Sequence, residues 1–118
     1  MELDGPKILI VEDEFLIAFD MQEVLENAGA VVVGPAESIK KALDFIHSGN
    51  ICAAIVDINL GAELSEQVVL SLRNSNIPFL YHSGQNALEK CSTWPQAPIL
   101  NKPSKPSVMI RELVNVLL

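Results

Sequence analysis

The stretch Ile8-Leu9-Ile10-Val11-Glu12-Asp13 leads four apolar residues directly into two carboxylates. The stretch Ala53-Ala54-Ile55-Val56-Asp57 repeats this order, and Ile99-Leu100-Asn101 leads into Lys102. Short, continuous apolar runs are typical of strands that are buried on both faces of a parallel sheet. Each run therefore predicts a buried strand with a charged side chain at its end.

Helix-like segments alternate with these strands. Apolar residues recur at helical spacing between them, and Ser38, Gly29, Gly49 and Pro106 stand where helix caps and first turns are expected. We predict helices over Glu14–Ala28, from Ser38 to Gly49, across Leu64, Val68 and Leu72, and from Pro106 onward. We predict a short, weak helix over Gln85–Ser92, and two further strands at Val31–Val33 and Phe79–Tyr81.

Five strand–helix units in succession predict an α/β fold, a parallel sheet with helices on both faces. The number of units suits the flavodoxin-like (βα)5 doubly wound sheet with strand order 2-1-3-4-5. In that fold ligands bind outside the carboxyl ends of the strands where the order switches, here after Glu12-Asp13 and Asp57. The 118 residues are expected to form a single domain, 1–118.

The composition of the chain limits the classes of partner and the location that we expect. The net charge is −7, which argues against a nucleic-acid-binding surface, and 49% of the residues are hydrophobic, enough for a packed core. The sequence predicts no membrane span and no signal peptide, so we expect a soluble cytoplasmic protein. Cys52 and Cys91 lack metal-ligand spacing. Cys52 is expected to be a core thiol, and Cys91 could be exposed.

Carboxylates that meet at one sheet edge repel each other unless a cation joins them. Glu12, Asp13 and Asp57 are such a set, and Lys102 would add a second positive charge. Aspartate is a poor nucleophile toward an anionic phosphoryl group, but Mg²⁺ and a lysine would together neutralise the charge on the phosphoryl oxygens. The constellation predicts a Mg²⁺-assisted phosphoryl site.

Four motifs, in this order and spacing, resemble the receiver domain of bacterial two-component response regulators. They are 8–14 (Ile-Leu-Ile-Val-Glu-Asp-Glu), 54–60 (Ala-Ile-Val-Asp-Ile-Asn-Leu), Ser83-Gly84 and Asn101-Lys102-Pro103. The resemblance extends from Lys7 to Leu118. It implies a phosphoprotein whose partners are a histidine kinase or histidine phosphotransfer protein and an unknown downstream protein, with no nucleic acid and no membrane.

The resemblance also implies a role for each site residue. Asp57 is similar to the phospho-accepting aspartate, and Lys102 to the lysine that pairs with the phosphoryl oxygens. Ser83 is similar to the switch hydroxyl. Glu12 and Asp13 are similar to the acidic pair that holds Mg²⁺, with Asp57 and the backbone carbonyl of Asn59 as further ligands. The Lys102–Pro103 peptide bond is expected to be cis, as is usual in this family.

The sequence departs from the family at several positions. Ile99 stands where an aromatic switch residue is usual, so signal transmission must differ; Tyr81 could compensate or could be a core aromatic. Gly61 replaces a common proline, which suggests a more mobile loop. Residues 78–84 resemble the FAT GUY receiver subgroup in part, with Tyr81, His82 and Ser83 for Phe, Ala and Thr. His82 alternates with Ser83 and is expected to point elsewhere.

Several functions stay open on these residues. The first is a stand-alone receiver, which is not an enzyme beyond its own phosphorylation and dephosphorylation. The second is a phosphorylation-independent interaction module on the same fold. A haloacid-dehalogenase-type phosphatase would place its nucleophile in an early Asp-x-Asp motif, ahead of the acidic pair, whereas here the order is reversed. A flavin binder needs a first loop that cradles phosphate, and Glu12-Asp13-Glu14 would repel it.

Overall fold

Five parallel strands form the central sheet of the computed structural model, which describes residues 3–84 and 88–118. The strands are β1 (Lys7–Val11), β2 (Val31–Ala36), β3 (Ala53–Asp57), β6 (Phe79–Ser83) and β7 (Ile99–Asn101). They lie in the order β2-β1-β3-β6-β7. Counted along the chain without the small hairpin described below, this is the flavodoxin-like order 2-1-3-4-5. The predicted fold is confirmed.

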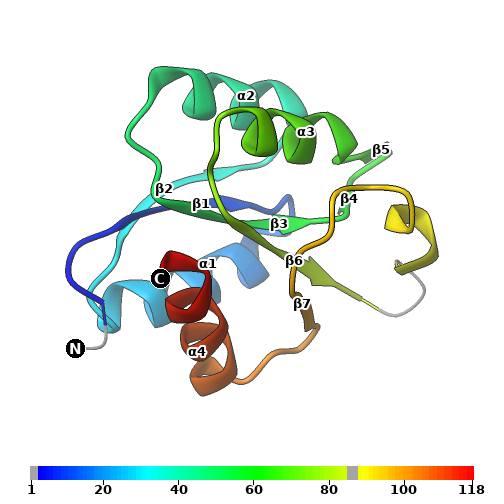
Figure 1. Ribbon diagram of the computed structural model, residues 1–118. Helices are drawn as coiled ribbons and strands as arrows, with labels where there is room; N and C mark the ends of the chain where they lie inside the picture. The colour runs from blue at the N-terminus through cyan, green and yellow to red at the C-terminus, as the bar shows by residue number, and fades with distance from the viewer. Residues whose placement is uncertain (1–2, 85–87) are drawn as a thin grey trace.

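Helices cover both faces of the sheet (Figure 1). α2 (Ile39–Ser48) and α3 (Glu66–Asn74) lie on one face, and α1 (Phe15–Asn27) and α4 (Pro106–Leu117) lie on the other. Within the described residues, a 3₁₀ turn (Leu88–Cys91) and an irregular stretch connect β6 to β7. Among the residues that the structure describes, 3–84 and 88–118, no helix is long and apolar enough to cross a membrane.

Two hydrophobic clusters hold the layers together. Because side chains alternate along a strand, Ile8 and Ile10 of β1 face α1 and α4, whereas Leu9 and Val11 face α2 and α3. All four are fully buried, which explains why this strand is a continuous apolar run. The same double burial at β3 leaves the charged groups only at the strand ends.

Three predicted helix ends, which depend on a single residue each, are confirmed. Ser38 is the N-cap of α2, and its Oγ accepts a hydrogen bond from the Lys41 N–H at 3.2 Å. Gly49 ends this helix with a φ of 87°, which glycine adopts without steric cost. Pro106 lies in the first turn of α4.

The segment after Asp57 differs from the prediction. Leu64 is exposed and belongs to a small antiparallel hairpin, β4 (Asn59–Leu60) and β5 (Glu63–Leu64), and α3 begins only at Glu66. Gly61 occupies the first position of the two-residue turn with a φ of 60°. Proline cannot adopt that φ, whereas glycine adopts it without steric cost, so the glycine favours the hairpin. The mobility of this loop stays a prediction.

Other expectations were wrong in detail. β2 continues through Gly34 and Pro35 to Ala36, with an irregular register opposite Leu9 and Val11. Of the short helix predicted over Gln85–Ser92, the described residues show the 3₁₀ turn Leu88–Cys91, and residues 85–87 lie outside the described part. Cys52 is exposed because it precedes the buried positions of β3, and Cys91 is buried.

Candidate functional site

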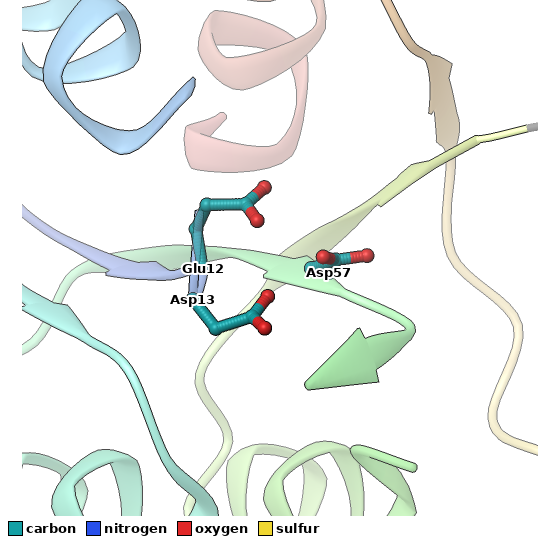
Figure 2. A group of neighbouring side chains, drawn as sticks. All are labelled: Glu12, Asp13 and Asp57. Atoms are coloured by element: carbon teal, nitrogen blue, oxygen red, sulfur yellow. The ribbon is translucent and has the colours of Figure 1, made fainter. Parts of the chain in front are cut away.

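Three carboxylates meet at the carboxyl ends of the two central strands (Figure 2). Glu12 and Asp13 directly follow β1, and Asp57 is the last residue of β3. Each residue offers an oxygen that lies within 4.8 Å of the others' oxygens. Glu12 and Asp57 are 1% and 5% exposed, whereas Asp13 is exposed to solvent. The sequence therefore predicted correctly that these three residues converge.

Lys102, which follows the edge strand β7, brings a positive charge into this cluster. Its backbone N–H donates to the Ser83 carbonyl at 2.8 Å. Its Nζ lies 2.9 Å from Glu12 Oε1 and 3.0 Å from Asp57 Oδ2. The Lys102–Pro103 peptide bond is cis, as the resemblance implied. Lys102 thus joins the two buried carboxylates.

Burial and the neighbouring charges together raise the pKa values of both Glu12 and Lys102. Burial, together with the charge of Asp57, raises the pKa of Glu12 to about 7, although Lys102 acts against this rise. Burial alone would lower the pKa of Lys102, but its close contacts with the Glu12 and Asp57 carboxylates outweigh burial and raise it. Near neutral pH the cluster therefore holds a charged lysine and one carboxyl group close to its titration midpoint.

The chemistry of this donor set fits a hard divalent cation. Carboxylate oxygens are the ligands that Mg²⁺ prefers, and a cation would favour the ionised form of Glu12 that burial disfavours. Asp57 Oδ1 also accepts a hydrogen bond from the Asn59 N–H at 3.3 Å, which orients the carboxylate. The Asn59 side chain accepts from Lys90 Nζ at 3.1 Å, and the role of its backbone carbonyl as a ligand stays a prediction.

Ser83 ends β6 beside the cluster. It is buried, and its Oγ has no hydrogen-bond partner among the described residues. A buried hydroxyl without a partner is uncommon in proteins, because the lost hydrogen bond costs about 1–3 kcal/mol. Such a donor is suited to an anionic oxygen placed at the same end of the sheet.

His82 lies close to the site, and the expectation that it points elsewhere was wrong. Its Nδ1 lies 3.9 Å from Glu12 Oε1, and its Nε2 lies 3.2 Å from Ser104 Oγ. Burial, and then the charge of Lys102, lowers the pKa of His82 to about 4, so the ring is neutral at pH 7. No pattern in the sequence indicates this contact, which depends on the pairing of His82 opposite Asp57.

The neighbouring strand region is aromatic. Tyr81 is buried on the opposite face of β6, where its hydroxyl donates to the Pro95 carbonyl and its ring lies 6.3 Å from that of Trp94. Ile99 pairs with Tyr81 in the sheet and is 43% exposed. Tyr81 therefore has the packing of a core aromatic and also anchors the segment that leads into β7. Its part in switching stays a prediction.

The chain was compared with known proteins. No family model and no curated protein matches it. Among solved structures it is similar to the response regulator receiver protein from Sinorhizobium medicae, with 30% identity, a TM-score of 0.85, and coverage of 96% of this chain and 94% of that chain.

The chain belongs to the response-regulator receiver family. The receiver domain of a diguanylate cyclase from Desulfovibrio desulfuricans is also similar, with 24% identity and a TM-score of 0.85 over 97% of this chain and 94% of that chain. The response regulator PhyR from Brucella abortus shares 24% identity with a TM-score of 0.82, over 96% of this chain and 48% of that chain. These two likenesses bear on the receiver fold alone, and the resemblance to the FAT GUY subgroup stays a prediction.

Proposed function

We propose that this receiver accepts a phosphoryl group on Asp57, from a histidine kinase or a histidine phosphotransfer protein, in a Mg²⁺-dependent reaction. The observation that carries the proposal is the single cluster in which Glu12, Asp13 and Asp57 place oxygens within 4.8 Å of one another. The Lys102 ammonium lies 3.0 Å from Asp57 Oδ2 in the same place. A nucleophile, a cation site and a fixed positive charge are the parts that phosphoryl transfer needs.

In the proposed reaction an Asp57 carboxylate oxygen forms a bond to phosphorus as the phosphorus–nitrogen bond to the donor histidine breaks. The electron pair of that bond stays with the imidazole. Lys102 moves from the Asp57 oxygen to a phosphoryl oxygen, and the Ser83 hydroxyl donates a hydrogen bond to another. Mg²⁺, held by Glu12, Asp13, Asp57 and the Asn59 carbonyl, would neutralise the negative charge on the phosphoryl group.

An exposed apolar surface next to the cluster supports a protein donor. Phe15 and Leu16 begin α1, directly after the acidic residues, and are 77% and 75% exposed. Phe19 lies one turn further, with its ring 6.3 Å from that of Phe15. Exposed, contiguous apolar side chains of this kind mark protein contacts. We propose that the donor protein docks here and places its phosphohistidine over Asp57.

The proposed outcome is a change in protein contacts. The aspartyl phosphate is lost again by attack of water, so the only reactions catalysed are the chain's own phosphorylation and dephosphorylation. A downstream protein would read the phosphorylated state.

Intact-protein mass spectrometry tests this function. After incubation with Mg²⁺ and acetyl phosphate, the wild-type chain should gain the mass of one phosphoryl group, and Asp57→Ala should gain none. Asp44→Ala, which removes an exposed carboxylate from α2, is the matched control and should behave as wild type. Uptake that persists in Asp57→Ala would overturn the assignment of the nucleophile.

A second candidate function is a phosphorylation-independent interaction module. It is favoured by one observation, the exposed Ile99 in place of an aromatic side chain. This function predicts Mg²⁺ binding without phosphoryl uptake from acetyl phosphate or from any of a panel of phosphorylated histidine kinases.

A further inference from the structure

Two buried polar atoms face each other across a short gap beside the acidic cluster. Glu12 Oε1 and His82 Nδ1 are 3.9 Å apart, and neither has a well-aligned hydrogen bond within the described residues. Glu12 Oε1 has only its ion pair with Lys102. Buried polar atoms without hydrogen bonds are rare in native proteins and call for an explanation.

The partner on the other side of the ring determines what His82 can offer to Glu12. Ser104 Oγ lies 3.2 Å from Nε2, and a hydroxyl can donate to a ring nitrogen that carries no proton. If the hydroxyl donates, the ring proton is on Nδ1, the atom that faces Glu12. In this tautomer His82 presents an N–H to the carboxylate.

We propose that His82 is a positioning residue, which holds the Glu12 carboxylate in place for the cation through a hydrogen bond from Nδ1. The inference rests on the proposed function for the cation site. The bond forms when the two side chains approach from 3.9 Å to a normal hydrogen-bond length of about 2.9 Å. Ligating carboxylates in metal sites are commonly held by such outer hydrogen bonds.

The hydrogen bond matters most during phosphoryl transfer. In the structure Lys102 is shared between Glu12 and Asp57, at 2.9 and 3.0 Å. When Lys102 turns to a phosphoryl oxygen, Glu12 loses its charged partner while it remains buried. Its Oε2 keeps the hydrogen bond from the Glu14 N–H at 3.2 Å, but its Oε1 loses the lysine, and a buried ionised oxygen without a hydrogen bond is costly. The Nδ1 proton of His82 replaces part of the lost interaction and keeps the Glu12 carboxylate directed at the cation.

The tautomer of His82 gives a first test, which needs neither metal nor phosphodonor. Long-range ¹H–¹⁵N NMR spectra distinguish the two neutral forms of a histidine ring. We expect His82 to carry its proton on Nδ1, and the exposed His47, assigned with His47→Gln, serves as the internal reference. In Ser104→Ala the proton should redistribute toward Nε2. A wild-type ring protonated on Nε2 alone would overturn the proposal.

Mg²⁺ affinity, measured by isothermal titration calorimetry at pH 7.5, gives the second test. His82→Leu keeps the shape of the ring near the backbone but offers no donor, and the Mg²⁺ Kd should rise about 10-fold. His82→Asn can place its amide N–H where Nδ1 now lies, and should restore most of the affinity. Ser104→Ala, at a half-buried surface position, should give an intermediate loss.

Tyr81→Phe is the matched control, because it changes a buried polar side chain next to His82 on the other face of the strand. Its Mg²⁺ Kd should equal that of wild type. An unchanged Kd in His82→Leu, or an equal loss in Tyr81→Phe, would overturn the proposal. The proposed function fails differently: wild type would then bind Mg²⁺ without taking up a phosphoryl group, and the Kd comparison would still decide the role of His82.

Discussion

The central strands, β1 and β3, carry their functional side chains in a different way from β6 and β7, the two strands toward one edge of the sheet, which we call the outer strands. At the ends of β1 and β3, charged groups are buried and held by ion pairs that meet at Lys102. On the face of β6 that carries Tyr81, the contacts are aromatic, and the Tyr81 hydroxyl donates a hydrogen bond to the segment that leads into β7. In the proposed function, the chemistry would depend on the strand ends, whereas transmission of the signal would depend on packing.

The two regions are nevertheless joined at one point. Ser83 ends β6 and Lys102 follows β7, and the backbone N–H of Lys102 donates to the Ser83 carbonyl. The Lys102 side chain reaches the acidic cluster, and Tyr81 lies two residues before Ser83 on the same strand. Changes on either side of this junction can therefore test whether chemistry and transmission are separate.

Loss of the Lys102 charge should have the largest effect on the central region. We expect Lys102→Met to slow phosphoryl uptake from acetyl phosphate roughly 100-fold, because a fixed charge at the reacting oxygens is removed. Time-resolved intact-mass measurements would give the rate. Lys105→Met removes an exposed lysine from the same loop and is the control. A rate near that of wild type would mean that Lys102 is structural only.

The raised pKa of Glu12 predicts a pH dependence of Mg²⁺ binding. Glu12 must be ionised to bind the cation, and its pKa in the metal-free protein is about 7. The protonated form dominates at pH 6 and the ionised form at pH 8, so the Mg²⁺ Kd should be about 10-fold weaker at pH 6. Calorimetric titrations at both pH values would measure this.

Glu12→Gln provides the contrast for that measurement. The amide does not titrate in this range, so the Kd of the variant should be weaker overall and should change little between pH 6 and pH 8. A wild-type Kd that is flat over this interval would show that Glu12 stays ionised without metal. The acidic cluster would then be better solvated than its burial indicates.

The smallest effect is expected in the outer region. Tyr81→Phe removes the hydrogen bond to the Pro95 carbonyl, and we expect the free energy of unfolding to fall by about 1 kcal/mol. The Trp94 amide, which donates to the Cys91 carbonyl at 3.0 Å, should exchange its hydrogen faster. Phosphoryl uptake should be unchanged. A slower uptake would break the separation of the two regions and favour a coupled role for Tyr81.

Much of the fold and of the acidic cluster follows from the sequence. Strands buried on both faces produce continuous apolar runs, and parallel strands bring their carboxyl ends to one edge. The positions of Glu12, Asp57 and Lys102 at one edge of the sheet can therefore be predicted from the sequence, without knowledge of the packing. The prediction that Leu64 belongs to the third helix was wrong, because a periodic apolar residue next to a helix can equally belong to a hairpin strand. Here Gly61 favours the hairpin.

The contact of His82 with Glu12 could not be predicted. It depends on the register of β6 against β3, which pairs His82 with Asp57. It also depends on the loop that brings Ser104 Oγ to the Nε2 atom of His82. A shift of one residue would have exchanged the faces of Tyr81 and His82. Sequence patterns determine which strands are neighbours, but side-chain contacts between a strand and a distant loop require coordinates.

Prolines at the two margins of the sheet have a further consequence. β2 contains Pro35, and the three-residue β7 lies between Pro98 and Pro103. A margin strand offers unpaired backbone groups on which another chain could continue the sheet, and a proline removes one such donor. Continuation of the sheet into a neighbouring copy is thus disfavoured at both sides. Assemblies of this protein, whatever their size, should use the outer surfaces of its helices.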